Sequence, residues 1–410
     1  MENLILYTIL FIIVSNFLFE QWLEYINLKN LKPLLPESLS NIYDQQSYEK
    51  SIAYEKINAQ FGLLTSSISF VAIILMILLQ GFNFIHQTAL LFNLNSVWTS
   101  LIFFGILMFA SDILSIPFAI YKVFVIEEKF GFNKTTIKTF IFDKLKNWLL
   151  MIILGGTLLG FIIYIYVKTG QNFWLYVWIF LTCFSIFMTL FYSNLIVPIF
   201  NKQTPLQDGS LRTAINSLAQ KAGFKLNNIF IINGSKRSTK ANAYFTGFGP
   251  KKRIVLYDTL INDLSENEIV AVLAHEIGHY KKKHVQQGLL YSTLHTGALL
   301  FIFSFFLSNP IFSKVLGADQ SYFHLNIIVI GILYSPISML LSLVMNKISR
   351  VNEYQADQFV VNFGLADDLV SALKKLSVKN LSNLTPHPFY VFIYYSHPTL
   401  LQRISQLQKK

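Results

Sequence analysis

Cysteine is almost absent from this chain, which has a single one, Cys183, inside an apolar run. One thiol cannot form an intramolecular disulfide or supply the several ligands of a cysteine zinc site. Charged residues are also scarce, since they make up 13% of the 410 residues against about 25% in soluble domains. With 53% hydrophobic residues as well, the chain is predicted to be an integral membrane protein.

Acidic residues are outnumbered by basic ones, 22 to 33, and the formal net charge is +11. No basic motif with interleaved base-stacking aromatic residues stands out, so we predict no nucleic-acid partner. In a membrane protein the excess of Lys and Arg is expected on the cytosolic side.

Seven apolar spans are long enough to cross a hydrocarbon core of about 30 Å. They are residues 4–19, 61–82, 97–123, 148–167, 173–200, 288–307 and 323–345. We interpret the first as a retained span, because it lacks the basic start and the small-residue cleavage site of a signal peptide.

The connections between the spans alternate in charge. The links after the second, fourth and sixth spans carry only Lys168 and Lys314, and the other 31 of the 33 basic residues lie in the remaining links or at their borders. The positive-inside rule therefore predicts a cytosolic C-terminus and an N-terminus outside. Usage rich in Lys, Asn, Ile and Phe adds the expectation of a bacterial chain, placed in the inner membrane.

Residues 265–280 are the stretch around which the chain is organised. Ser265 and Glu268 form a capping-box pattern, and apolar residues at helical spacing follow, which predicts the start of a helix. His275 and His279 lie four residues apart on one face of that helix, so both imidazoles can reach one zinc ion. The alternative is a surface helix with idle histidines, but the small apolar neighbours fit a partly buried metal site better.

Glu276 projects beside these histidines, where its carboxylate can take a proton from the attacking water. Together the three residues form the HExxH pattern of zinc metalloproteases.

Residues 201–286 form the one long polar insertion before the C-terminal tail. A helix at 211–222 and strands at 228–232, 241–247 and 253–257 are predicted to precede the HExxH helix. A small sheet beside a zinc helix is typical of proteases, and an edge strand can hold an extended peptide.

Two histidines leave a catalytic zinc one protein ligand short. Because the sixth and seventh spans form a hairpin, the third ligand is expected beyond the seventh span, about 10–14 Å along a continuing helix. Glu353 is the predicted ligand, and Asp357, one turn further on, is the predicted acceptor for a ligating imidazole. A solvated acidic helix face is the alternative for both carboxylates.

His397 and Arg403 are six residues apart near the C-terminus. A His-Pro turn that caps a final helix explains the pair by itself. In a zinc protease the same side chains can bind the developing oxyanion and the substrate backbone.

Taken together, these features resemble the type I CAAX prenyl protease family of integral-membrane zinc proteases. The resemblance covers nearly the whole chain and rests on the seven spans and on the segments 125–133, 241–245, 275–279, 350–357 and 396–403. The bacterial stress proteases of the HtpX type resemble the chain less, because they have fewer spans and lack the EEKFGF loop at 127–132.

The resemblance implies an all-α integral membrane protein with seven transmembrane helices around a chamber, plus a small α+β zinc-protease domain on the cytosolic side. It implies one Zn²⁺ per chain, held by His275, His279 and Glu353. Glu276 is implied as the general base. The groups implied to hold the substrate or stabilise the transition state are Asn242, His397 and Arg403.

The implied activity is cleavage of peptide bonds near the C-terminus of a peptide or protein substrate, with or without a prenyl group, in contact with membrane lipids. One alternative is a broad-specificity quality-control protease of the HtpX type. Another is a transporter with a non-catalytic metal site, which Glu276 disfavours because a structural zinc site needs four closed ligands and no base.

We predict four segments. Residues 1–200 hold five transmembrane helices and cytosolic links, and 201–286 hold the soluble zinc-protease core. Residues 287–346 hold the last two transmembrane helices, and 347–410 complete the catalytic domain with the third zinc ligand.

Overall fold

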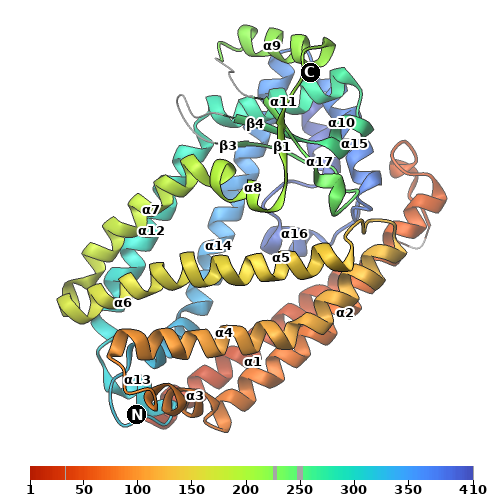
Figure 1. The fold of residues 1–410 in the computed structure, drawn as a ribbon. Coiled ribbons are helices and arrows are strands. Elements are labelled where there is room, and N and C mark those ends of the chain that lie inside the picture. Colours follow the sequence, from red (N-terminus) through yellow and green to blue (C-terminus); the bar gives the residue numbers. More distant parts are fainter. Residues whose placement is uncertain (33, 225–228, 247–252, 410) are drawn as a thin grey trace.

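The computed structural model describes residues 1–32, 34–224, 229–246 and 253–409, and most of them are helical (Figure 1). In the N-terminal half the helices are α1 (Glu2–Lys29), α2 (Gln45–Leu78), α3 (Gly81–Leu90), α4 (Ser96–Tyr121), α5 (Ile137–Leu150), α6 (Thr157–Thr169), α7 (Phe173–Leu195) and α8 (Val197–Phe200). The others are α9 (Ser210–Lys221), α10 (Asp258–Asp263), α11 (Glu266–Lys281), α12 (His284–Phe306), α13 (Pro310–Val315), α14 (Phe323–Asn362), α15 (Ala366–Lys379), α16 (Pro388–Tyr394) and α17 (Leu400–Leu407).

Shorter elements join these helices. Two π-helical turns, η2 (Lys122–Glu127) and η3 (Met151–Gly156), continue α4 and α5, and 3₁₀ turns lie at η1 (Glu37–Leu39), η4 (Gly170–Asn172) and η5 (Gly234–Lys236). The strands are β1 (Gln203–Pro205), β2 (Ile229–Ile232), β3 (Ala243–Thr246) and β4 (Arg253–Tyr257). Polar side chains accept backbone N–H groups at several helix starts, namely Asp44, Asn95, Thr136, Ser265 and Thr399.

Six helical stretches in the described residues are long and apolar enough to cross a membrane. They are Glu2–Lys29, Gln45–Leu78, Ser96–Glu127, Ile137–Phe200, His284–Phe306 and Phe323–Asn362. Five of the seven predicted spans lie inside these stretches, and the second and sixth extend past them to residues 82 and 307. Two spans share Ile137–Phe200, which turns at Gly170 with φ 54°. The predicted number of seven spans is therefore not confirmed, because Ile137–Phe200 counts as one stretch although it holds two of the predicted spans.

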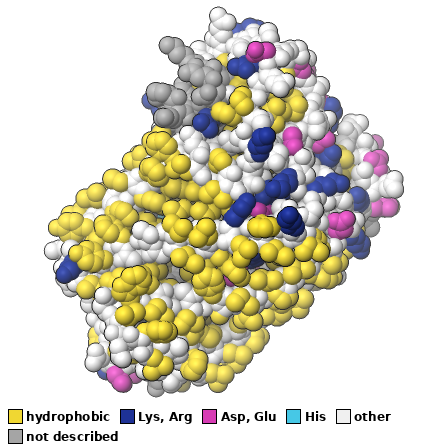
Figure 2. Space-filling view, in the orientation of Figure 1, with side chains coloured by type: hydrophobic (Ala, Val, Ile, Leu, Met, Phe, Trp, Pro, Cys, Tyr) yellow, Lys and Arg dark blue, Asp and Glu magenta, His cyan; other side chains and the backbone are white. Residues whose placement is uncertain are grey.

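The surface of the long helices is apolar. Figure 2 shows hydrophobic side chains over the part of the molecule that holds these helices, whereas Lys and Arg side chains gather toward the sheet. Large apolar side chains such as Leu4, Phe11 and Leu114 are exposed there, as a lipid-facing surface requires. The N-terminus lies at the far end of the helices from the sheet (Figure 1).

The four strands form one sheet in the order β1-β2-β4-β3. β2 and β4 are parallel, and the outer strands β1 and β3 run antiparallel to their neighbours. Three predicted strands correspond to β2, β3 and β4, although Gly247 and the predicted turn at Gly249 and Pro250 lie outside the described residues. The strand β1 was not predicted, since three residues ending in Pro205 carry too weak a pattern.

Helix α11 is largely buried beside the sheet. Ile269, Leu273 and Ile277 are buried along it, in a hydrophobic core shared with α9, β4 and α15. On another side α11 packs against α14, and Gly278 lies so close to α14 that a Cβ there would meet the Cα of Ala356 at 3.1 Å. The two helices that carry the predicted metal ligands are therefore in direct backbone contact.

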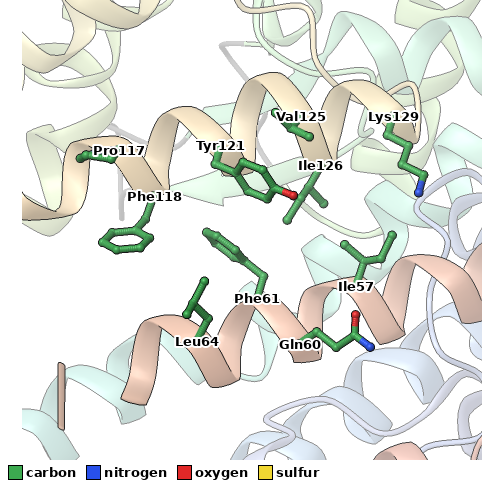
Figure 3. A pocket seen from close by; sticks show the side chains of 10 residues that line it. All are labelled: Ile57, Gln60, Phe61, Leu64, Pro117, Phe118, Tyr121, Val125, Ile126 and Lys129. Carbon is green, nitrogen blue, oxygen red and sulfur yellow. The ribbon is translucent and has the colours of Figure 1, made fainter. Parts of the chain in front are cut away.

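An apolar cleft of about 540 Å³ lies between α2 and the continuous helix of α4 and η2 (Figure 3). The rings of Phe61 and Tyr121 stack across it with centroids 5.5 Å apart. Lys129 lies at one end of the cleft, beside Ile126 (Figure 3). The cleft thus has apolar walls and one basic group.

Candidate active site

The start of α11 is held by the capping box that the sequence predicts. The Ser265 hydroxyl accepts the N–H of Glu268, and the Glu268 carboxylate accepts the N–H of Ser265. The same carboxylate accepts hydrogen bonds from Ser371, at 2.6 Å, and Lys375, at 2.8 Å, on α15. Burial alone would raise the pKa of Glu268, but the bonds to Lys375, Ser371 and Ser265 outweigh it and lower the pKa to about 2.

About two turns further along α11, His275 begins a group of three converging metal-donor side chains. The Nε2 atoms of His275 and His279 are 3.1 Å apart. The Glu353 carboxylate on α14 lies 3.4 Å from His275 and 3.2 Å from His279. Ligands at about 2.0–2.1 Å from a tetrahedral zinc are about 3.3 Å from one another. The donor set therefore fits a zinc ion in both chemistry and spacing, and among the described residues it is the only such His and carboxylate group found.

Asp357 and Arg403 lie behind these donors. Asp357 is fully buried, and its carboxylate is 2.9 Å from Nδ1 of His275. Arg403 donates to both Asp357 oxygens, at 2.9 and 2.6 Å, in a two-pronged ion pair. A metal-ligating histidine usually donates its second ring N–H to such a carboxylate, which fixes the ring.

The electrostatics of the site favour a cation. Burial tends to lower the pKa of His275, but hydrogen bonds to Asp357 and Glu353 outweigh it and raise that pKa. The same negative field attracts a divalent metal.

Glu276 lies beside the donors on α11 and is partly buried. Burial raises its pKa, against the opposing charges of His275 and His279. A carboxylate with a raised pKa is a better base near neutral pH than an ordinary one.

A cavity of about 300 Å³ joins these groups to the residues from the rest of the chain. Its lining is Ala241, Asn242, Ala243, Leu260, Val272, His275, Glu276, His279, Glu353, Leu369, Leu373, Leu376, His397 and Arg403. Every predicted site residue except the buried Asp357 thus faces one cavity, although these residues come from four separate parts of the sequence.

Asn242 and His397 lie on different walls of that cavity. Asn242 directly precedes β3, an edge strand, and its side chain accepts the N–H of Ala243. The His397 side chain is 64% exposed, and its Nε2 is 3.3 Å from the Glu353 carboxylate. A substrate can therefore reach both.

The loop at 127–134 supports the segment that leads into Asn242. Lys240 donates to the Glu127 carboxylate at 3.0 Å and lies over the Phe132 ring at 4.3 Å. Backbone bonds join Thr239 to Phe132 and Lys134 to the 237 carbonyl. No role was predicted for this loop beyond its part in the family resemblance.

Two further residues at the site were not predicted. His284, the first residue of α12, is 7% exposed, and its Nδ1 is 2.9 Å from Nδ1 of His279. Its Nε2 is 3.1 Å from the Gln355 side-chain oxygen on α14. The sequence could have indicated these residues only by their positions, since His284 lies five residues beyond the HExxH pattern and Gln355 lies two beyond the predicted third ligand.

The three metal donors, of which Glu353 is on the membrane-crossing stretch Phe323–Asn362, define the class as membrane-embedded zinc metalloproteases. Residues 205–410 match the family described as peptidase family M48, and residues 24–202 match the family described as CAAX prenyl protease N-terminal, five membrane helices. The chain belongs to the CAAX prenyl protease 1 family of M48 peptidases and is an integral, multi-pass membrane protein.

The relatives cover almost the whole chain. CAAX prenyl protease 1 of Saccharomyces cerevisiae is 37% identical, over 96% of this chain and 93% of the relative. The Arabidopsis thaliana homologue is also 37% identical, over 97% of this chain and 96% of its own. The crystal structure of S. mikatae Ste24p matches with a TM-score of 0.94 at 35% identity, covering 98% of this chain and 99% of that one.

These findings confirm the predicted family and the predicted zinc metalloprotease activity, and they do not favour the HtpX-type alternative. The relatives named above are eukaryotic, so the predicted bacterial source has no support from them.

Proposed function

We propose that His275, His279 and Glu353 hold one catalytic zinc ion and that Glu276 is the general base of peptide hydrolysis. The observation that carries this assignment is the 300 Å³ cavity, in which three donors 3.1–3.4 Å apart share a wall with Glu276. A structural zinc site would need a fourth protein ligand and no adjoining cavity.

A bound zinc ion supplies Lewis acidity, which polarises the scissile carbonyl and acidifies a water molecule. Glu276 takes the proton of the attacking water and delivers it to the leaving amine. His397 donates a hydrogen bond from the exposed wall to the oxyanion that develops on the carbonyl. Arg403 stays fixed against Asp357 and keeps a positive charge behind the donors.

The substrate is held in an extended form. β3 is the edge of the sheet, so a peptide can pair with the backbone of the segment that begins at Asn242. The Asn242 amide then anchors the substrate backbone beside the scissile bond.

We further propose that the substrate ends in a CAAX sequence with a prenyl group, as the names of the relatives state for those proteins. The apolar cleft of Figure 3 supports a lipidated substrate, because its walls suit a hydrocarbon chain. It adjoins the loop that contacts Lys240, two residues before Asn242.

The membrane arrangement is proposed as seven transmembrane helices around a chamber, with a small α+β zinc-protease domain, the C-terminus and the zinc site in the cytosol and the N-terminus outside. The four segments 1–200, 201–286, 287–346 and 347–410 are its units. Polar side chains inside the helical part support a chamber, since Glu20, Glu24 and Asn58 line a cavity of about 300 Å³ there.

The test compares Glu276→Gln with the unaltered protein on prenylated and unprenylated CAAX peptides. We expect Glu276→Gln to keep one zinc per chain and to lose turnover by at least about 100-fold, as for the loss of a general base. Near-normal cleavage by this variant would refute the assigned base.

The lipid part of the proposal has its own pair of variants. Leu64 lines the cleft of Figure 3 and is 51% exposed, whereas Leu75, on the same helix α2, is 46% exposed and lies outside that cleft. Leu64→Gln should raise KM for the prenylated peptide by up to about 10-fold, from the loss of one apolar contact. Leu75→Gln should leave that KM unchanged. Equal effects of the two changes would argue against lipid binding in this cleft.

A further inference from the structure

We infer that His284 is a positioning residue for the metal ligand His279, and that Gln355 fixes the direction of the hydrogen bond between the two imidazoles. The inference rests on the proposed role of His279 as a zinc ligand. It concerns the ring nitrogen of His279 that faces away from the metal site.

The two ligating histidines are supported by different chemistry. The Nδ1 atom of His275 faces the Asp357 carboxylate, at 2.9 Å. The Nδ1 atom of His279 faces another imidazole, that of His284, also at 2.9 Å. One ring is thus held by an anion and the other by a neutral group with two possible proton positions.

Gln355 selects between those positions. Its side-chain oxygen is 3.1 Å from Nε2 of His284, so it accepts a hydrogen bond from an Nε2–H group. Neutral His284 then has a lone pair on Nδ1, which accepts the Nδ1–H of His279. The Nε2 atom of His279 is left without hydrogen, and this is the atom that lies 3.2 Å from the Glu353 carboxylate. The reverse arrangement would put a hydrogen on Nε2 of His279 and block a metal.

The backbone brings His284 back to His279. In an uninterrupted helix a residue five positions on would lie about 140° around the axis, away from the metal face. Here α11 ends at Lys281 and Lys283 adopts a left-handed conformation with φ 60°. A lysine in that conformation is strained, and the turn that it makes directs the first residue of α12 toward the site.

The two hydrogen bonds His279–His284 and His284–Gln355, called the relay below, also connect three elements. His279 is on α11, His284 begins α12, and Gln355 is on α14, two residues after Glu353. The hydrogen bonds therefore hold the second ligand in a fixed orientation relative to the helix that supplies the third.

The test uses purified full-length protein with three single variants and measures the zinc dissociation constant by competition with a chelator. His284→Phe keeps an aromatic ring but removes the acceptor, and His284→Asn keeps an acceptor oxygen near the position of Nδ1. The control is His295→Phe, a histidine change on α12 whose imidazole contacts Tyr334 instead of the metal site.

We expect His284→Phe to weaken zinc binding about 10- to 100-fold, as for loss of the hydrogen-bond partner of a ligating imidazole. His284→Asn should recover most of that loss, and His295→Phe should bind zinc like the unaltered protein. The melting temperature of the zinc-free protein should be the same for His284→Phe and His284→Asn, because the relay acts through the metal site.

Two results would overturn the inference. One is a His284→Phe protein with an unchanged zinc dissociation constant. The other is equal zinc loss in His284→Asn and His284→Phe together with a fall in the melting temperature of both zinc-free proteins, which would mark a structural role. Failure of the proposed function would look different, because the unaltered protein would then lack one zinc per chain.

Discussion

The contact between α11 and α14 makes Gly278 a sensitive position of the site. Gly278 lies between the two histidines of the metal site, and it touches the helix that carries Glu353. A methyl group at Gly278 would meet the Cα of Ala356 at 3.1 Å, the Cβ of Phe359 at 3.1 Å and the carbonyl oxygen of Ala356 at 3.2 Å. Carbon atoms pack best at about 3.5–4.0 Å, so α11 and α14 must separate by a few tenths of an ångström.

The size of the effect follows from two opposing contributions. Alanine favours a helix over glycine by about 1 kcal/mol, whereas overpacking a core costs about 1–3 kcal/mol. Gly288 on α12 offers the matched control, because nothing lies within 4 Å of a Cβ placed there. Gly288→Ala therefore carries only the helical gain, and Gly278→Ala should be less stable than it by about 1–3 kcal/mol.

Zinc affinity should fall with stability in Gly278→Ala. Glu353 lies three residues before Ala356 on α14, so it moves with the contact that the new methyl group displaces. Zinc sites tolerate changes of about 0.2 Å in their ligand distances. We therefore expect the zinc dissociation constant of Gly278→Ala to be about tenfold larger than that of the unaltered protein.

The assay measures thermal unfolding of both variants in detergent with the metal removed, followed by chelator competition for zinc. The close-packing explanation would be refuted if Gly278→Ala matched Gly288→Ala both in thermal stability and in its zinc dissociation constant.

Three further outcomes are expected. Glu268→Gln should lower the free energy of unfolding by about 3 kcal/mol at pH 7, since the native pKa of Glu268 is lowered from 4.5 to about 2. A lowered carboxylate pKa stabilises the fold above about pH 4.5 and loses that effect toward pH 2. The free energies of unfolding of the two proteins should therefore converge as the pH falls through this range. A constant difference between them would contradict the assigned ion pair with Lys375. His397→Ala should keep zinc and lower kcat about 100-fold, as for loss of an oxyanion donor, and a change in KM alone would argue for substrate binding only. Lys240→Met should raise KM with unchanged zinc content, because the bond from Lys240 to Glu127 supports the segment before Asn242; normal KM would remove the loop from substrate positioning.

The sequence predicted the local elements of the site well, because each has a short-range signal. The Ser265 capping box and the His275 and His279 spacing both depend on helix geometry alone. Glu353 was predicted by a longer step, through the hairpin of the last two spans, and α14 does run without a break from Phe323 to Asn362. A helix that continues past the membrane carries its periodicity with it, which made this step workable.

Other features depended on contacts that no local pattern encodes. His284 reaches His279 only because Lys283 adopts a left-handed conformation, and lysine gives no sequence signal for that. Asp357 was predicted to face a ligating imidazole, but its pairing with Arg403 joins α14 to the C-terminal helix. Pairs so distant in the sequence are set by tertiary packing.

The hydrogen bonds behind the two histidines connect the candidate site to helices that form membrane-crossing stretches. Glu353 and Gln355 are on α14, the helix that also forms a membrane-crossing stretch, and His284 opens α12, which forms another. Any tilt of α12 against α14 would change the distance from His284 to Gln355 and so the orientation of His279. Asp357 and Arg403 support the other histidine without any contribution from α12. In the proposed site His279 is therefore the histidine whose support depends on α12, whereas the support of His275 depends on α14 and α17.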